Sequence, residues 1–473
     1  MAVKTSTKSA AIHDRLSHPV IDSDGHWIEY EPAVMEYIRG VVGRESAGRY
    51  ERITRVRLGA MNTTLAQRQA AKLPQPAWWP FPTKNTLDRA TAMLPRLLYE
   101  RLPDMGMDFC VLFPTSVMTM VPFMRDEELR RGGTRALNAY AADLFRDYAD
   151  RMTPVAGVPI HTPQEAIEEL EHIKSLGLKV VMLAGLVNRH VPGEDGRSRI
   201  WRDPLGLDSD YDYDPVWAKC LELKLIPTFH NSTQGLGFRV STSNWVYNHI
   251  GHFATAGDTL CKALFLGGVT RRFPRLKFAF LEGGAGWACS LYSDLIRHWN
   301  TRNLAALEWV HPDNLDEKLF RDLAERYGDP LMRQTVKGNP IIRKDIESPP
   351  PQLDDFWRCE IKRAEDIRDL FVPNFYFGCE AEDPMNAAAF NRRVNPFGVR
   401  LNAILGSDIG HFDVKDMTQV LEECWELVEH GVLSEEELRD LTFTNPVNLF
   451  AGMNPDFFKG TVVEKQVAEF MAS

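Results

Sequence analysis

Short apolar runs alternate with stretches of helical periodicity along most of this chain, and this alternation limits the fold more than any other feature of the sequence. The runs are largely continuous in apolar residues, which is typical of parallel strands buried on both faces. Eight β/α units in one chain predict an α/β fold, a (β/α)8 TIM barrel with helical insertions. The eight runs cover residues 19–22, 108–113, 153–160, 178–183, 225–230, 276–284, 371–378 and 401–408.

Helix signals lie between these runs. Residues 162–165 (Thr-Pro-Gln-Glu) offer a capping threonine, a first-turn proline and an acidic residue, and they predict a helix over 166–176. A helical pattern also covers 215–223, and two helices over 416–430 and 434–441 are expected to close the barrel.

Two segments do not fit the β/α pattern. The long segment near 41–85 and the charged segment near 300–370 are predicted as helical insertions that either cover the active-site face or form an oligomer interface. We therefore expect three parts: a flexible or partner-docking N-terminal arm at 1–18, one barrel domain at 19–450, and a C-terminal tail at 451–473.

Composition excludes several function classes. The 473 residues have a formal net charge of −10, which gives a nucleic-acid partner no electrostatic support. No run of about eighteen apolar residues could span a membrane, and the polar first residues lack the apolar core of a signal peptide. The seven cysteines are scattered without CxxC spacing, as in a reduced protein. We expect a cytoplasmic enzyme for a small-molecule substrate, forming a homo- or hetero-oligomer.

Ionisable side chains stand where the predicted strands end, which is where (β/α)8 barrels carry their function. Asp24 and His26 follow the first strand and would point to the same side, with Gly25 between them. Two imidazoles with carboxylates in such positions indicate a divalent-metal site that keeps open positions for water or substrate. The other strand-end candidates are His230, Glu282, Glu380 and Asp408.

Three motifs in order resemble the amidohydrolase superfamily, and specifically its amidohydrolase 2 branch: Asp24-Gly25-His26, the lone His230, and Gly406-Ser407-Asp408. The resemblance covers roughly residues 19–450. It implies a metal-dependent hydrolase or nonoxidative decarboxylase that acts on a small carboxylated or aromatic substrate. It also implies that Asp24, His26, His230 and Asp408 hold zinc or another divalent metal, while Glu282 and Asp408 supply catalytic carboxylates.

The chain also departs from the branch. Asp24 stands where the superfamily often has a histidine, Glu282 stands where the branch usually has one, and the fourth strand ends without a group that bridges two metals. His252 and His411 lie beyond the fifth and eighth strands and would supply a second site, with Glu282 or Asp408 bridging. A carboxylate-rich site favours iron or manganese over zinc.

These departures leave two alternatives open. The chain is similar to a small group of amidohydrolase-related oxygenases with dinuclear iron or iron–manganese centres, such as a 2-aminoisobutyrate hydroxylase, which would imply a monooxygenase served by a reductase. A non-catalytic partner subunit that keeps the metal for stability is the other alternative. Arg239, in a Gly/Ser/Thr-rich loop, either clamps a substrate carboxylate or is an ordinary surface arginine.

Overall fold

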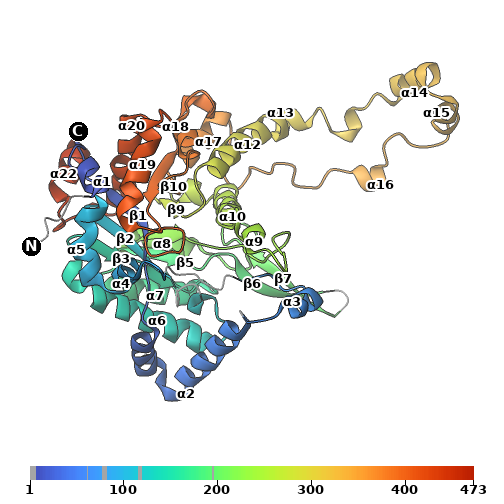
Figure 1. Cartoon of the computed structure of the whole chain (residues 1–473). Helices are drawn as coiled ribbons and strands as arrows, with labels where there is room; N and C mark the ends of the chain where they lie inside the picture. Colours follow the sequence, from blue (N-terminus) through green and yellow to red (C-terminus); the bar gives the residue numbers. More distant parts are fainter. Residues whose placement is uncertain (1–6, 61, 77–82, 116–119, 194–195) are drawn as a thin grey trace, which may run out of the picture.

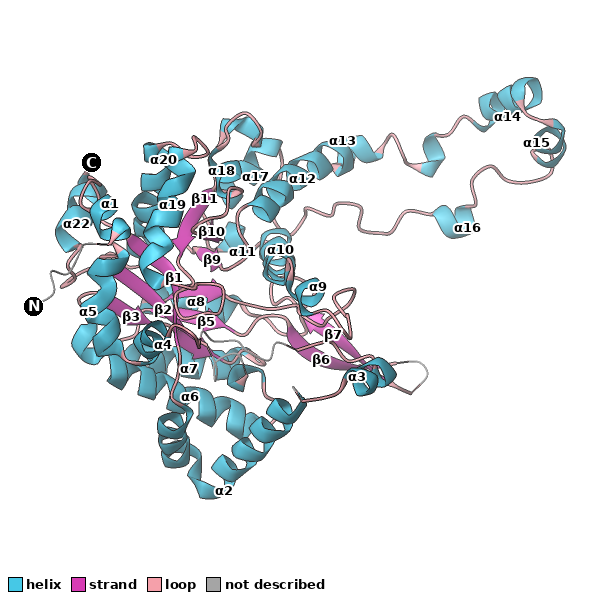
Figure 2. Ribbon diagram, viewed as in Figure 1, coloured by secondary structure: helices cyan, strands magenta, loops and turns pink. Residues whose placement is uncertain are grey.

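Parallel strands form the centre of the molecule, and helices surround them (Figures 1 and 2). The structure, a computed structural model, describes residues 7–60, 62–76, 83–115, 120–193 and 196–473. The parallel strands are β1 (Ile21–Trp27), β2 (Phe109–Pro114), β3 (Met152–Pro154), β4 (Ala156–Val158), β5 (Val180–Leu183), β8 (Ile226–Phe229), β9 (Phe278–Phe280), β10 (Phe375–Glu380) and β11 (Asn402–Gly406). They lie in the orders β1-β2-β3 and β11-β10-β9-β8-β5-β4.

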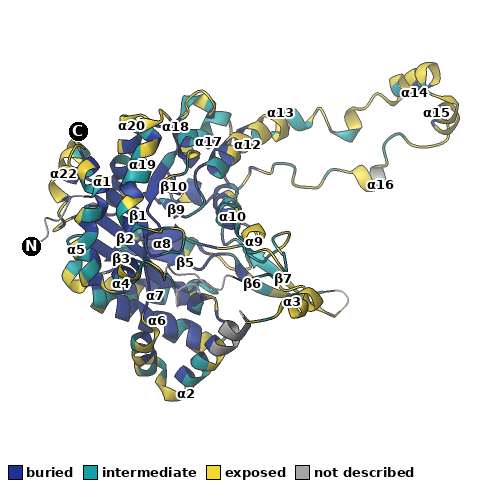
Figure 3. Cartoon of the chain, viewed as in Figure 1, coloured by how far each residue is buried: buried dark blue, intermediate teal, exposed yellow. Residues whose placement is uncertain are grey.

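The two sheets together make one barrel. β3 and β4 are one strand interrupted at Val155, whose backbone N–H donates to Leu112 O at 2.9 Å. At the other junction β11 runs beside β1, and the backbone N–H of Asp408 donates to Asp24 O at 3.0 Å. The N–H of His26 donates in turn to Ile409 O at 2.9 Å. The predicted (β/α)8 barrel is therefore confirmed, with its strands buried almost throughout (Figure 3).

The helical layer follows the amphipathic patterns of the sequence. The helix predicted from residues 162–165 is present, because the Thr162 side chain accepts a hydrogen bond from the Glu165 backbone at 3.2 Å. The helices around the barrel are α2 (Glu31–Ala60), α3 (Leu65–Ala71), α4 (Thr86–Met93), α5 (Pro95–Met105), α6 (Glu127–Phe145), α7 (Pro163–Ser175), α8 (Asp214–Leu223), α9 (Trp245–His249), α10 (His252–Leu266), α11 (Val269–Arg272), α12 (Gly286–Arg302), α17 (Ala364–Phe371), α18 (Asn386–Phe390), α19 (Val420–Glu429), α20 (Glu435–Arg439) and α21 (Asn445–Met453).

Two elements differ from the sequence-based expectation. The run predicted as a strand from Phe371 begins later, because Phe371 is the last residue of α17 and its ring packs into the core. An antiparallel hairpin, β6 (Val187–Pro192) and β7 (Ser198–Asp203), follows β5 and was not expected. Its strands are rich in polar and charged residues and are largely exposed, so they lack the continuous apolar runs of the barrel strands.

The N-terminal segment also differs from the expectation of a flexible arm over 1–18. From residue 7 onward it is ordered by α1 (Lys8–His13), in which Ser9 and Ile12 are buried. The Ser9 hydroxyl accepts from the Glu422 backbone at 3.1 Å, so the helix is fastened to the C-terminal part of the barrel. Residues 1–6 lie outside the described residues. At the other end, α22 (Glu464–Ala472) packs through Phe470 against Phe443, with the ring centroids 5.6 Å apart.

The segment at 300–370 extends away from the barrel (Figure 1). It holds α13 (Leu304–Leu307), α14 (Glu317–Tyr327), α15 (Pro330–Thr335) and α16 (Lys344–Glu347), with largely exposed side chains (Figure 3). The prediction that it is helical is thus correct for its short helices, while extended chain links them to α12 and α17. Within the described ranges, no helix combines the length and apolar character needed to cross a membrane.

A buried ion pair between α6 and α7 gives a testable stability difference. Arg130 Nη2 lies 2.8 Å from Glu165 Oε2, and the two side chains are 7% and 2% exposed. Removing one partner of such a pair leaves a buried charge without compensation, so Glu165→Ala should destabilise the protein by about 3–5 kcal/mol.

The matched control is Glu127→Ala, which breaks the exposed Glu127–Arg131 pair on the same helix and should change stability by at most about 1 kcal/mol. Thermal unfolding of both variants beside wild type measures the difference. Equal melting temperatures for the two variants would contradict the role assigned to the buried pair.

Candidate metal centre

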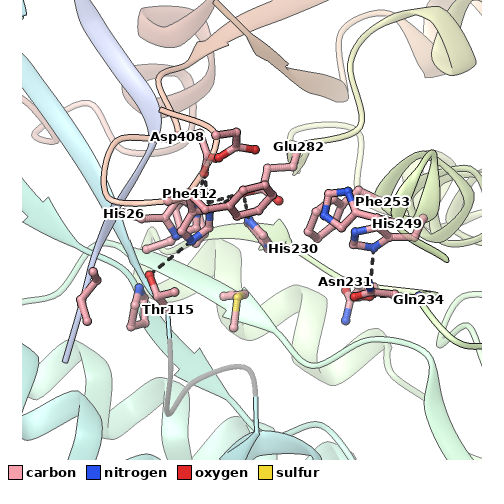
Figure 4. A pocket seen from close by; sticks show the side chains of 18 of the residues that line it. His26, Thr115, His230, Asn231, Gln234, His249, Phe253, Glu282, Asp408 and Phe412 are labelled. Carbon is pink, nitrogen blue, oxygen red and sulfur yellow. Dashed lines mark hydrogen bonds and ion pairs between the residues drawn. The ribbon is translucent and has the colours of Figure 1, made fainter. Parts of the chain in front are cut away.

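Four strand ends and one loop bring six ionisable side chains together at the mouth of the barrel, and Figure 4 labels His26, His230, Glu282 and Asp408 among them. β1 supplies two of them, and the ends of β8, β9 and β11 supply one each. The sixth follows β11 in the loop after residue 408. All six side chains are at most 16% exposed, so they form a closed cluster rather than a surface group. The six are Asp24, His26, His230, Glu282, Asp408 and His411.

Glu282 Oε1 lies at the centre of this cluster. It is 3.1 Å from His26 Nε2, 3.2 Å from His230 Nε2 and 3.3 Å from His411 Nδ1. The two aspartates lie on the flanks, with Asp24 Oδ1 at 3.6 Å and Asp408 Oδ1 at 3.4 Å from His26 Nε2. One glutamate oxygen therefore contacts three imidazoles that come from three different parts of the chain.

The ligand atoms divide into two overlapping groups, each with its atoms within 4.8 Å of one another. Asp24, His26, His230 and Glu282 make the first group. His26, Glu282, Asp408 and His411 make the second. Since His26 and Glu282 belong to both, Glu282 stands where a carboxylate shared between two neighbouring ions would stand.

The donor atoms fit a metal ion by their burial and their lack of other partners. Within the described residues, Asp24 Oδ1, His26 Nε2, His230 Nε2, Glu282 Oε1 and Asp408 Oδ1 are buried and make no hydrogen bond of good geometry. Buried polar atoms normally have such partners, and a group of them aimed at one point indicates a bound ion. The mixture of imidazole and carboxylate ligands suits zinc, iron and manganese.

Protonation balances the charge of the cluster when no ion is present. Burial raises the pKa of Asp24 and of Asp408 well above the usual range, and the charge of Glu282 adds to the rise in both. Burial, together with the electrostatic effect of the neighbouring His411, lowers the pKa of His26 to about 3. A divalent cation would compete with these protons, because metal ligands must be deprotonated.

His230 and Glu282 behave in the opposite way. Burial would lower the pKa of His230, but the charge of Glu282, 3.2 Å away, outweighs burial and raises it to about 9. Burial would likewise raise the pKa of Glu282, but His230 and the other imidazoles hold it well below its usual range. His230 and Glu282 therefore favour each other's charged form.

Backbone strain accompanies both of the carboxylates that follow β9 and β11. Glu282 has φ 54° and Asp408 has φ 48°, in the left-handed region that side-chain-bearing residues rarely adopt. Strain of this kind persists where the surrounding structure fixes it, and it concentrates at functional sites. The same turn-like conformation directs both carboxylates towards the other ligands.

Asp22 ties the strand ends together, and the sequence did not single it out. Its carboxylate is fully buried and accepts hydrogen bonds from Ser407 N at 3.0 Å, from Ser407 Oγ at 2.6 Å and from Asp24 N at 3.2 Å. Gly25 is required beside it, because a Cβ at that position would lie 2.5 Å from Asp22 Oδ2. Its place two residues before Asp24 was the only signal of its role.

A cavity of about 1890 Å³ opens onto the ligand atoms. Its aromatic wall contains Phe113, Trp245, Phe253 and Phe412, and cationic side chains reach it from other elements. The described part of the segment near 41–85 also lines the cavity, with Tyr50, Leu73 and Pro74 among its residues. The cationic lining residues are Arg89, Arg202 and Lys415, and the polar ones nearest the aromatic wall include Asn231, Gln234 and His249.

Two candidates from the sequence lie elsewhere. His252 lines the cavity but belongs to neither ligand group, and its Nδ1 is 2.9 Å from Ser232 Oγ. Its ring packs instead against His249, with the ring centroids 4.5 Å apart. Arg239 donates to Gly251 O at 2.9 Å and lines a second cavity rather than the one above the ligands. Glu380, a further strand-end candidate, lines the main cavity.

Comparison with known proteins gives one match at the level of a family. The sequence model of the family described as "Amidohydrolase" matches residues 24–329. Among curated proteins, none matches the chain.

Solved structures give matches of low identity. An amidohydrolase from Mycobacterium avium subsp. paratuberculosis K-10 is 18% identical, with 77% of this chain and 76% of that chain covered and a TM-score of 0.48. A 2,6-dihydroxybenzoate decarboxylase from Rhizobium is 14% identical over 92% of this chain and 98% of that chain, with a TM-score of 0.48. A dihydroxybenzoic acid decarboxylase from Polaromonas sp. JS666, with bound manganese and 2-nitroresorcinol, is 12% identical over 92% and 97%, with a TM-score of 0.49.

Proposed function

Since the chain belongs to the amidohydrolase family, we propose that it is a metal-dependent enzyme that hydrolyses or nonoxidatively decarboxylates a small carboxylated or aromatic substrate. The family assignment confirms the resemblance carried by the motifs at Asp24, His230 and Asp408. The observation that supports the proposal best is that the buried, unpartnered ligand atoms face an open cavity. A subunit that kept a metal only for stability would not need such a cavity.

The lining of the cavity supports the proposed substrate class. Phe253 and Phe412 offer apolar ring surfaces for an aromatic substrate, and Arg202 or Lys415 offers a cation for a carboxylate. We propose that Arg202 takes the role that the sequence suggested for Arg239. Arg202 lies on β7, and its Nη1 donates to Asn188 Oδ1 at 3.2 Å, which orients the guanidinium.

Asp24, His26, His230 and Glu282 would hold a first ion, with Asp408 beside it. When bound, a divalent ion polarises a substrate oxygen or lowers the pKa of a coordinated water. Asp408 is the group that we propose to move the proton, with Glu282 as the alternative. In hydrolysis it accepts a proton from water. In decarboxylation the bonding electron pair stays on the ring carbon as carbon dioxide leaves, and Asp408 delivers the proton to that carbon.

A second candidate function is supported by the second ligand group. His26, Glu282, Asp408 and His411 would hold a second ion, and three carboxylates among six ligands favour iron or manganese. This arrangement supports a dinuclear iron or iron–manganese monooxygenase that takes electrons from a separate reductase. His411 would complete the second site in this proposal, and His252 would not.

Metal content tests whether the second group binds an ion. Protein purified without added metal should contain about two ions per chain, and His411→Ala should lower this to about one, because the first group stays complete. Elemental analysis measures the loss.

His298→Ala is the matched control, because His298 on α12 is exposed and belongs to neither group. One zinc per chain, unchanged in His411→Ala, would contradict the dinuclear site. Consumption of dioxygen in the presence of a reductase would favour the oxygenase, and carbon dioxide release without dioxygen would favour the decarboxylase.

We propose a cytoplasmic location and the absence of nucleic-acid and membrane partners. All seven cysteines are buried and unpaired, as in a reduced environment. The net charge of −10 opposes binding to DNA.

A further inference from the structure

Residues 303–363, called the arm below, leave the end of α12 and return to α17 after reaching well beyond the barrel (Figure 1). Its two distal helices, α14 and α15, pack against each other and stand clear of the barrel. A helix of 11 residues and one of 6 residues are too short to be stable alone in water. The arm therefore needs a further surface to pack against.

The arm carries an apolar surface that no described part of its own chain covers. Among residues 304–347 whose exposure is described, Ala324 and Val336 are the buried apolar side chains. Trp309 is 91% exposed, and α14 presents Leu319, Leu323 and Tyr327 along one face. Contiguous exposed apolar side chains of this kind mark an interaction surface. The exposed apolar side chains of the arm are Leu304, Trp309, Val310, Leu315, Leu319, Leu323, Tyr327, Leu331, Ile346 and Trp357.

A second uncovered apolar surface lies on the barrel beside the cavity mouth. It consists of Phe238, Val240, Val246, Tyr247 and Ile250 and is called the 238–250 patch. Phe238 is 97% exposed, although its backbone carbonyl is held by the Tyr247 hydroxyl at 3.1 Å. The patch is therefore an ordered surface with an exposed ring at its tip.

The patch and the arm adjoin each other at the root of the arm. Arg239 and Gly251, at the edges of the patch, line the second cavity together with Phe356 and Trp357 of the arm. The tip of the arm nevertheless points away from this patch (Figure 1). Within the described part of the chain, the arm and the patch are thus two exposed apolar surfaces on one side of the barrel, and α14 and α15 of the arm do not reach the patch of the same chain.

We propose that the arm packs on the 238–250 patch of a second copy of this chain, and that the second copy returns its own arm to the first. Two-fold exchange of identical elements buries both surfaces twice and closes the assembly. The arm has 12 acidic and 10 basic residues, so it brings little net repulsion to a partner with charge −10. Exposed Trp309 and Tyr327 supply the aromatic anchors typical of such interfaces.

This exchange also bears on the active site. Trp245 and His249 belong to α9, the helix that carries part of the patch, and both line the main cavity. A partner arm packed on the outer face of α9 would stabilise the position of that helix. The interaction does not depend on which reaction the enzyme performs.

The test is the mass of the full-length protein in solution by light scattering and sedimentation. Wild type should be a dimer, twice the 53.8 kDa chain mass. The arm variant Leu323→Asp and the patch variant Phe238→Asp should each raise the dissociation constant by about 100-fold or more. Met471→Asp is the matched control, because Met471 is 52% exposed on α22, across the molecule from the arm, and should leave the dimer intact.

A mixture of two variants distinguishes this reciprocal exchange of arms from other modes of dimerisation. An arm variant combined with a patch variant retains one intact arm–patch contact, so the mixture should dimerise more tightly than either variant alone. Circular dichroism checks that each variant keeps its fold. A monomeric wild type would overturn the proposal and leave the arm to a different protein. Dimeric arm variants, or an equal mass for the mixture and its components, would overturn it as well.

Discussion

Replacing Glu282 by glutamine is expected to empty the metal centre and to lower activity by about 100-fold or more. Glu282 Oε1 lies within 3.3 Å of three imidazoles and belongs to both ligand groups, so one substitution weakens every ion that the cluster holds. Removal of a group that merely orients a ligand already costs about 10–100-fold in metal affinity or activity, and loss of a shared ligand should exceed that. Elemental analysis of protein purified in parallel with wild type measures the metal directly.

Glu282→Asp is the conservative variant for this test, and Glu100→Gln is its control. Aspartate keeps the charge but shortens the side chain, so Glu282→Asp should retain more metal than Glu282→Gln. Glu100 lies exposed on α5 beside Arg96, and Glu100→Gln should keep full metal content and activity. A Glu282→Gln variant that kept wild-type metal would show that the carboxylate is not a ligand.

Much of the barrel follows from the sequence because each strand is a short, continuous apolar run between helix signals. Continuous runs indicate strands buried on both faces, and they order the strand ends along one rim. For this reason Asp24, His26, His230, Glu282 and Asp408 were all recognised as candidates at that rim.

The apolar pattern of the strands does not predict the conformation of the loops that follow them at the rim of the barrel. His252 and His411 both follow strand-end histidine or aspartate positions, yet only His411 reaches the ligand cluster. The difference arises because Gly251 adopts φ 70° and begins α10 at His252, whose Nδ1 then pairs with Ser232. A left-handed glycine at one loop position cannot be read from residue spacing.

The sequence predicted the arm as a charged helical insertion, but it did not predict that this insertion projects away from the barrel. The α14 sequence has apolar residues at helical spacing, and such a face normally packs on its own domain. Only the three-dimensional position of α14 shows that this face has no partner among the residues that the structure describes.

Asp22→Ala is expected to destabilise the protein by about 3 kcal/mol and to loosen the metal centre at the same time. The substitution leaves Ser407 N, Ser407 Oγ and Asp24 N without their acceptor in a fully buried site, and each such loss costs about 1–3 kcal/mol. Asp24 and Asp408 are the ligands next to these donors, so both lose the support that fixes their position. Metal affinity should fall by about 10–100-fold.

Asp22→Asn separates the hydrogen bonds from the charge. Its Oδ1 still accepts from the two backbone N–H groups, and its Nδ2 can donate to Ser407 Oγ, so this variant should keep most of the stability and metal affinity. Thermal unfolding of the metal-free proteins, followed by metal titration, measures the two effects independently. If Asp22→Ala melted like wild type and bound metal as tightly, Asp22 would not be the tie between β1 and β11. If it lost stability but kept its affinity, the rim would be fixed by the backbone bonds from Asp408 N and His26 N instead.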